Sequence, residues 1–309
     1  MTAALILAAG SIAEGSKFDP TAKIDGYSPL RRLISTFYKM DIDRIVVVTG
    51  FNAERVASHG SHTSAIFIHN PNFEDDDMLA SIKFGLNYLA DKCDRTFIAP
   101  VNVPFFTVET LEALASAHTG GISIPAHGVK VGHPLLASTD VFNEIIGYSG
   151  EDGMQGMLAS TSVNRTFVNV SDKRCLYEIN DETIDKLPED VTRLKVEASV
   201  KVMLRRGERF FGPGALKMLM YTEECGSKQN AAERTGISYS KCNSLTEDIV
   251  AALGYPIYDL RRGGRDGKGG VDLNEQCHDL LRRYKAFMKE SEKLNNELFE
   301  KHFGDTELW

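Results

Sequence analysis

The sequence has 309 residues, of which 42% are apolar and 25% are charged, the profile of a globular protein long enough for two domains. It has no run of about 18 apolar residues and no basic or small-residue leader pattern, so we expect neither a membrane span nor a secretory signal. The five cysteines are scattered and form no C-x-x-C pair, which argues against a disulfide framework or a zinc site and predicts a cytoplasmic protein.

Charge is distributed unevenly along the chain. Residues 1–199 contain 17 basic and 26 acidic residues, whereas residues 200–309 contain 18 and 17. This asymmetry predicts two modules with different partners, and the acidic balance of the first argues against nucleic-acid binding there.

The first strand ends at a glycine. The apolar run Leu5 to Ala9 predicts a short buried strand, which Gly10 then closes. Because Gly10 has no Cβ, the backbone can approach a phosphate there and point N–H groups at it, and Lys23 would neutralise further charge. An ordinary buried strand end is the alternative interpretation, since one glycine turn is weak evidence for a phosphate site.

Helix and strand patterns alternate after this strand. The sequence predicts helices over 29–40, 52–57 and 78–89, and strands over 44–50, 65–69 and 95–99. This alternation predicts a doubly wound, mostly parallel, Rossmann-like α/β sheet, in which ligands collect at the carboxyl ends of the strands. Gly10, Gly50, Asn70 and Asn102 fall at those ends.

Short motifs in the first 190 residues resemble those of nucleotidyltransferases of the molybdenum-cofactor branch, which join CMP or GMP to molybdopterin. The matching motifs are Leu7–Gly10 with Lys23 and Gly26, Val47–Gly50, Asn70–Asn72, Met78–Ser81, Val101–Pro104 with Thr107, Gly132–Pro134, Ser149–Gly153, Tyr177–Asp181 and Pro188–Asp190. Ala9 stands where GMP-transferring members have Gly, so the resemblance favours CTP over GTP.

The resemblance also implies roles for individual residues. It implies a nucleotide site of Leu7, Ala8, Ala9, Gly10, Ser11, Lys23, Asn70 and Ser81, and a substrate site of Gly132, His133 and Pro134. It further implies Mg²⁺ held by Asn102, Glu151 and Asp152, with Lys23 and Asn102 in the catalytic positions. The simpler alternatives are that Asn102 caps a turn, Glu151 and Asp152 begin a helix, and His133 bonds within a wall.

The sequence departs from the family pattern at two of these places. The phosphate-binding arginine that follows the glycine is missing, with Glu14 near its place and Lys17 as the available substitute. Asn102 replaces a magnesium-binding aspartate, and an amide oxygen is a weaker ligand for Mg²⁺ than a carboxylate.

Residues 196–309 show a different pattern. Helices are predicted over 215–225, 227–234, 239–253 and 275–303, with two short strands over 257–260 and 271–273. A helix, a glycine-containing turn and a second helix are typical of a helix-turn-helix, and the strands around the basic tip would form a wing. The region resembles the DNA-binding domain of the molybdate-responsive repressor ModE.

A recognition helix and a wing would contact double-stranded DNA. The residues in these positions are Ser238, Tyr239, Ser240, Lys241, Asn243, Arg261, Arg262, Arg265 and Lys268. A protein-docking module is the alternative interpretation. The last helix is too long for so small a domain to cover, which predicts a homodimer.

We therefore expect a nucleotidyltransferase-like domain over 1–195 and a ModE-like winged helix over 196–309. The first hypothesis is an enzyme that transfers CMP or GMP to molybdopterin and is coupled to DNA-binding regulation. The second is a transcription regulator whose transferase domain senses a nucleotide or a pterin with little or no turnover.

Overall fold

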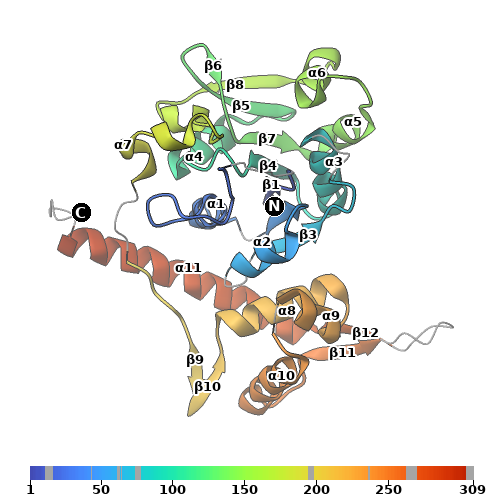
Figure 1. Ribbon diagram of the computed structural model, residues 1–309. Coiled ribbons are helices and arrows are strands. Elements are labelled where there is room, and N and C mark those ends of the chain that lie inside the picture. Colours follow the sequence, from blue (N-terminus) through green and yellow to red (C-terminus); the bar gives the residue numbers. More distant parts are fainter. Residues whose placement is uncertain are drawn as a thin grey trace. The chain divides into compact units, whose positions relative to one another are not determined.

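The computed structural model describes residues 1–10, 17–42, 44–60, 63, 65–73, 78–193, 198–235, 237–261 and 270–303 (Figure 1). The chain divides into two compact units, Met1–Leu194 and Lys195–Trp309. No helix within the described ranges combines the length and the apolar character that a membrane crossing needs.

The first unit is an α/β structure. Its strands are β1 (Thr2–Ala8), β2 (Arg44–Thr49), β3 (Ile66–His69), β4 (Arg95–Pro100), β5 (Ile122–His127), β6 (Lys130–Val131), β7 (Leu135–Ser138) and β8 (Arg165–Asn169). Its α-helices are α1 (Pro29–Lys39), α2 (Ala53–His59), α3 (Met78–Leu89), α4 (Val108–Ala117), α5 (Phe142–Gly147), α6 (Gly153–Ser160) and α7 (Glu189–Thr192). Three short 3-10 helices are η1 (Thr139–Val141), η2 (Lys173–Leu176) and η3 (Ile184–Lys186).

These strands form one mixed sheet in the order β3-β2-β1-β4-β7-β5-β6, with β8 paired to β5. The pairs among β1 to β4 are all parallel, as the strand–helix alternation predicts. Strand β7 lies between β4 and β5 and is antiparallel to both. The predicted strands and helices between residues 29 and 99 are confirmed, and α3 has the predicted bounds.

The central strand β1 is buried on both faces. Ala4 and Ile6 belong to the core that also contains apolar residues of α1 and α4. On the opposite face Leu5 contacts α3 so closely that a Cβ on Gly85 would lie 2.3 Å from the Leu5 Cδ1 atom. A glycine is needed at position 85 for this packing, because any side chain would push the helix off the strand.

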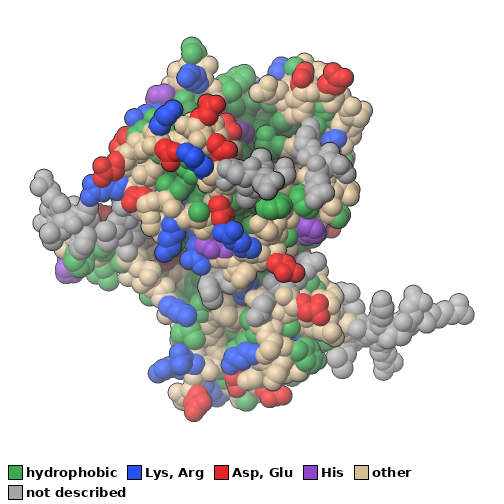
Figure 2. Space-filling model, viewed as in Figure 1, with side chains coloured by type: hydrophobic (Ala, Val, Ile, Leu, Met, Phe, Trp, Pro, Cys, Tyr) green, Lys and Arg blue, Asp and Glu red, His purple; other side chains and the backbone are tan. Residues whose placement is uncertain are grey.

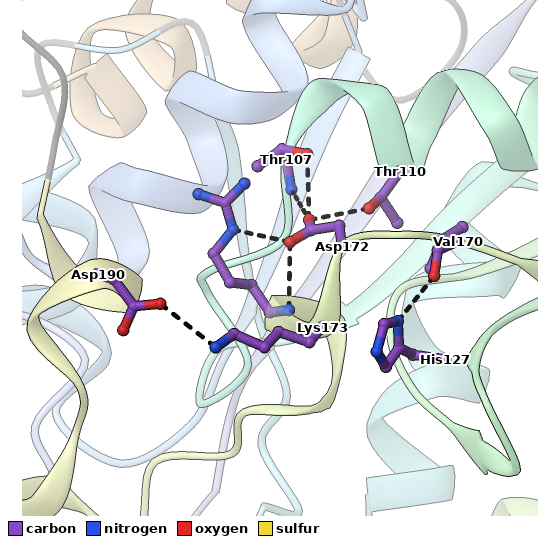
Figure 3. Close-up of polar contacts among 8 residues, drawn as sticks. Thr107, Thr110, His127, Val170, Asp172, Lys173 and Asp190 are labelled. Atoms are coloured by element: carbon purple, nitrogen blue, oxygen red, sulfur yellow. Dashed lines mark hydrogen bonds and ion pairs between the residues drawn. The ribbon is translucent and has the colours of Figure 1, made fainter.

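Asp172 joins the end of β8 to the start of α4 (Figure 3). Its Oδ2 accepts hydrogen bonds from the Thr107 backbone N–H at 3.0 Å, the Thr107 hydroxyl at 3.1 Å and the Thr110 hydroxyl at 3.0 Å. Its Oδ1 accepts from Arg174 Nε at 2.7 Å. Burial alone would raise the pKa of Asp172, but the hydrogen bond and charge of Arg174, with the bonds from Thr107 and Thr110, lower it. The first turn of α4 is therefore capped from outside the helix, whereas the Thr107 side chain makes no capping bond.

The described residues of the second unit form a pair of two-stranded sheets and four helices. Its elements are β9 (Leu204–Arg206), β10 (Glu208–Phe211), α8 (Pro213–Cys225), α9 (Lys228–Thr235), α10 (Tyr239–Leu253), β11 (Tyr258–Arg261), β12 (Gly270–Leu273) and α11 (Glu275–Phe303). The predicted bounds of α10 and α11 are confirmed. Strands β11 and β12 pair antiparallel, and β9–β10 is a hairpin that the sequence analysis did not predict.

The core of this unit links its first hairpin to its last helix. The rings of Phe211 on β10 and Tyr284 on α11 meet edge to face at 4.8 Å between centroids. The Tyr284 hydroxyl donates to the Val202 carbonyl at 2.9 Å. Burial raises the pKa of Tyr284 to about 12, because the phenolate would lose its hydration there.

Changing Asp172 to Asn should lower the free energy of unfolding by about 1–3 kcal/mol, since it leaves the buried hydroxyl of Thr110 and the partly buried donors of Thr107 and Arg174 poorly satisfied. The pKa of Asp172 is lowered in the folded protein, so its stabilisation is present above pH about 3.8 and is lost as the pH falls through the folded pKa. Urea denaturation followed by circular dichroism at pH 7 measures the effect, with the exposed Asp140→Asn as control. Equal denaturation midpoints for Asp172→Asn and the wild type would contradict this role.

Candidate functional site

A pocket of about 280 Å³ opens at the carboxyl ends of β1, β2 and β4. Three segments that follow strands reach it, together with the start of α3 and residues near the opening loop. Its lining consists of Leu7, Ala8, Ala9, Gly10, Phe18, Asp19, Pro20, Thr21, Phe51, Asn52, Arg55, Val56, Phe73, Met78, Ser81, Pro100, Val101 and Asn102.

Six predicted site residues line this pocket, namely Leu7, Ala8, Ala9, Gly10, Ser81 and Asn102. Gly10 is exposed, and a Cβ there would meet nothing within 4 Å. The fold itself therefore does not require a glycine at position 10, and the backbone in front of it is open to a ligand. Ser11 lies outside the described residues.

Asn70 and Ser81 meet behind the pocket wall. Asn70 is buried, and its Nδ2 lies 3.5 Å from the Ser81 hydroxyl. Its Oδ1 accepts from the Asn72 backbone N–H at 3.1 Å, which shapes the turn after β3. Ser81 faces the pocket, whereas Asn70 supports it.

Gly50 lies where the segments after β1 and β3 come together. A Cβ on Gly50 would lie 2.3 Å from the Ala9 carbonyl oxygen and 2.5 Å from the Phe73 Cβ, so a glycine is needed for these two segments to pack.

Asn102 lies beside a carboxylate that the sequence analysis did not assign to the site. The Asn102 side-chain Nδ2 donates to Glu178 Oε1 at 2.9 Å, and the Asn102 backbone carbonyl accepts from the Ile179 N–H at 2.7 Å. Glu151 and Asp152, the predicted metal ligands, are exposed in the loop between α5 and α6 and do not line the pocket. Asp152 directly precedes α6 in a left-handed conformation with φ 65°, without a side-chain capping bond. Among the described residues there is no cluster of three or more His, Cys, Asp or Glu side chains suited to a metal.

The two lysines expected near the phosphates lie outside the pocket lining. The Lys17 ammonium pairs with Asp185, and its backbone N–H donates to Asp181 Oδ1 at 2.8 Å. Lys23 is exposed on the turn that precedes α1. The cation that does line the pocket is Arg55 on α2, which pairs with Asp19 at 2.5 Å.

The Gly132–His133–Pro134 segment packs against η2. A Cβ on Gly132 would lie 2.4 Å from the Cys175 carbonyl oxygen, and the His133 N–H donates to that oxygen at 3.0 Å. The His133–Pro134 peptide bond is cis. Burial lowers the pKa of His133 to about 4, and its Nδ1 atom is buried with no hydrogen-bond partner in the described structure. This segment does not line the pocket.

Five of the residues predicted to contact DNA lie at the start of α10. Ser238, Tyr239, Ser240 and Lys241 are exposed, and the Ser238 hydroxyl accepts from the Lys241 N–H at 3.2 Å, which caps the helix. Asn243 Oδ1 accepts from the Lys228 ammonium at 3.1 Å. Arg261 ends β11, and Arg262, Arg265 and Lys268 lie outside the described residues.

Sequence reasoning did not find Arg55 and Asp19, which line the pocket as an ion pair, or Glu178, which contacts Asn102. Arg55 and Asp19 are 36 positions apart, and Asn102 and Glu178 are 76 apart. One signal was available for Arg55: it follows β2 within six residues, on the edge of the sheet where ligands collect.

A mixed, mostly parallel sheet with a glycine turn and a pocket at its carboxyl edge is the arrangement in which α/β proteins bind their ligands. Residues 4–166, more than half of the chain, match the family described as the MobA-like NTP transferase domain. The chain belongs to this family.

Two further comparisons agree with this assignment. The molybdenum cofactor cytidylyltransferase of Escherichia coli (strain K12) is 28% identical over 96 residues, which are 31% of this chain and about half (48%) of that relative. The crystal structure of Rv0371c from Mycobacterium tuberculosis H37Rv is similar at a TM-score of 0.52 and 15% identity, over 60% of this chain and 95% of that one. At this identity the likeness shows the fold.

Acid should destabilise the protein through His133. The ordinary pKa of about 6.5 applies to the unfolded chain, and the folded value is about 4, so the unfolded state binds more protons between these values. Stability should therefore fall as the pH drops from about 6.5 to about 4, with about 2 kcal/mol of the loss between pH 7 and pH 5 due to His133. Urea denaturation at the two pH values should show a smaller loss for His133→Gln than for the wild type or for His302→Gln, which changes an exposed residue of α11. Equal losses in all three proteins would refute this assignment.

Proposed function

We propose that the first unit transfers CMP, or GMP, from a nucleoside triphosphate to a molybdopterin-type acceptor. The observation that carries the proposal is the pocket at the end of β1, where the open Gly10 backbone, Ser81 and Asn102 meet. Family membership supports the use of a nucleoside triphosphate. The match to a molybdenum cofactor cytidylyltransferase, together with Ala9, favours CTP and a pterin acceptor.

The proposed chemistry is an in-line displacement at the α-phosphorus. A terminal phosphate oxygen of the acceptor forms the new bond, the bond to the bridging oxygen breaks, and pyrophosphate leaves. The chain contributes mainly positioning and electrostatics, because the transferred group is already activated. The N–H groups after β1 would face the phosphates, and the walls around Ser81 and Phe73 would hold the nucleoside.

Asn102 with Glu178 would hold a magnesium ion better than Asn102 with Glu151 and Asp152, because Glu178, which itself lies outside the pocket lining, contacts the pocket residue Asn102. Mg²⁺ is commonly held by one or two carboxylates together with substrate phosphates and water. Glu178 supplies the carboxylate and Asn102 an amide oxygen once its side chain rotates, since the two side chains are already in contact. When bound, the ion would neutralise charge that develops on the phosphates.

We propose that the second unit is a winged helix that binds double-stranded DNA. Helices α9 and α10 and the hairpin β11–β12 have the order that this motif requires, and the exposed start of α10 would enter the major groove. The proposed partner of α11 is its copy in a homodimer. Phe287, Leu294 and Leu298 on α11 are more than half exposed, a costly arrangement for a helix that remains alone.

A second candidate function is a transcription regulator that binds a nucleotide or a pterin without efficient transfer. Asn102 favours this regulator function, because its side chain is uncharged at the position where the resemblance to the family implies a metal-binding aspartate. The two candidates differ in product formation. Full-length protein incubated with Mg²⁺, molybdopterin and CTP or GTP forms a nucleotidylated pterin and pyrophosphate if it is an enzyme, and binds without product if it is a sensor.

Asn102→Asp should raise magnesium-dependent transfer, because a second carboxylate beside Glu178 would attract the ion more strongly. Each tenfold gain in rate corresponds to about 1.4 kcal/mol of transition-state stabilisation. Glu178→Gln should lower transfer, and Glu182→Gln, which changes an exposed neighbour, serves as control. Ordinary turnover by the wild type with no gain in Asn102→Asp would show that the amide suffices, and unchanged transfer in Glu178→Gln would remove Glu178 from the site.

Full-length protein should bind duplex DNA with an affinity that falls steeply as salt rises. Replacing Arg261 and Arg262 together by Ala should reduce the slope of log affinity against log salt by about two, as expected for two lost phosphate contacts. The double variant Lys130→Ala and Arg165→Ala removes two charges from the first unit and should leave the slope unchanged. Fluorescence anisotropy measures this, and absence of duplex binding at low salt would contradict the proposed DNA-binding unit.

A further inference from the structure

Arg55 is the one cation among the described residues that line the pocket, and Asp19 is the one anion there. Arg55 is the third residue of α2 and lines the pocket together with Val56 and with Asn52, which precedes the helix. Of the two lysines expected near the phosphates, Lys17 is paired with Asp185 and Lys23 is exposed on the turn before α1, and neither lines the pocket. Gly10 and Arg55 both line the pocket, so Arg55 supplies the positive charge that the segment after Gly10 lacks at the position of the family arginine.

Asp19 holds Arg55 with a carboxylate that is itself fixed. Asp19 Oδ2 accepts from Arg55 Nη2 at 2.5 Å, while Oδ1 accepts from the Thr21 N–H at 2.8 Å and the Thr21 hydroxyl at 2.7 Å. The Arg55 side chain is 60% exposed. Ion pairs this exposed contribute only about 0.2–1 kcal/mol, so an incoming phosphate with greater charge can exchange with Asp19.

The surroundings of α2 add positive charge. Burial lowers the pKa of His59. The nearby positive charges of Arg31, Arg55 and Lys23 lower this pKa further, whereas the negative charge of Asp19 raises it. Arg31 also donates from Nε and Nη2 to the His59 carbonyl at 3.2 and 3.1 Å. Figure 2 shows Lys and Arg side chains gathered beside a histidine near the middle of the view. An anion in the pocket therefore meets Arg55 and the fixed carboxylate of Asp19 directly, while Arg31 and Lys23 lie outside the lining and add positive charge near His59.

We propose that Arg55 binds the polyphosphate of the nucleotide and that Asp19 is the internal anion which the polyphosphate displaces. This inference rests on the proposed function for its ligand, a nucleoside triphosphate. In this proposal a residue of α2 binds the phosphates. Removing the charge of Arg55 should weaken nucleotide binding, whereas removing the charge of Asp19 should strengthen it. A guanidinium freed from Asp19 can donate two parallel hydrogen bonds to phosphate oxygens.

Calorimetric titration of the full-length protein with CTP, GTP and inorganic tripolyphosphate tests the proposal. Arg55→Ala should weaken both CTP and tripolyphosphate by about 10- to 100-fold, the loss expected for a charge-assisted hydrogen bond. Asp19→Asn keeps the Oδ1 acceptor for Thr21 and should tighten both ligands by about two- to fivefold. Lys92→Ala removes an equal charge at the amino-terminal edge of β4 and should change neither.

The outcomes separate this inference from the proposed function. A wild type that binds neither CTP nor GTP would contradict the proposed function and, with it, the role of Arg55. Normal CTP binding by the wild type with equal affinity in Arg55→Ala would overturn only the role of Arg55. Weaker CTP but unchanged tripolyphosphate binding in Arg55→Ala would also overturn it, because the arginine would then contact the nucleoside. If Arg55→Ala does not fold, Asp19→Asn decides: unchanged or weaker binding of tripolyphosphate contradicts the exchange.

Discussion

The burial of β1 on both faces is the constraint on which the first unit depends. Strand β1 pairs in parallel with β2 and β4, so the three strands end at the same edge of the sheet. The residues that follow each strand must therefore share the space at that edge. The tight contact of Leu5 with Gly85 fixes α3 against the strand and brings Ser81 to that edge. The pocket is thus a consequence of how the central strand is packed.

The polar side chains of this site form pairs. Arg55 is held by Asp19, and Asn102 is held by Glu178. The family resemblance implies an arginine after Gly10 and a carboxylate at position 102. We propose that α2 supplies the arginine and that the segment after η2 supplies the carboxylate. Each pair is exposed enough for a ligand to rearrange it. We therefore interpret the departures from the family motif as a redistribution of charge within one site, a hypothesis that the proposed variants of these four residues address.

The sequence was sufficient for the elements whose pattern is local. The apolar run of β2, the helical spacing of α1 and the capped start of α10 all depend on neighbours within a few residues, and their bounds were predicted within one or two positions. The antiparallel strands β6 and β7 and the hairpin β9–β10 are short and weakly patterned, and they were not predicted. The resemblance placed Gly10, Ser81 and Asn102 in one site, and the structure brings them to one pocket. The partners Glu178 and Asp19 could not be found in this way, because side-chain pairs over long sequence separation are set by the packing of the whole unit.

The central claim is that the pocket at the end of β1 is a nucleoside triphosphate site. A crystal structure of the full-length protein grown with CTP and Mg²⁺ tests it most directly. Our account predicts phosphates against the backbone that follows β1, within reach of Arg55, and the nucleoside between Phe73 and Ser81. A nucleotide bound elsewhere in the protein, with this pocket empty at saturating CTP, would contradict it.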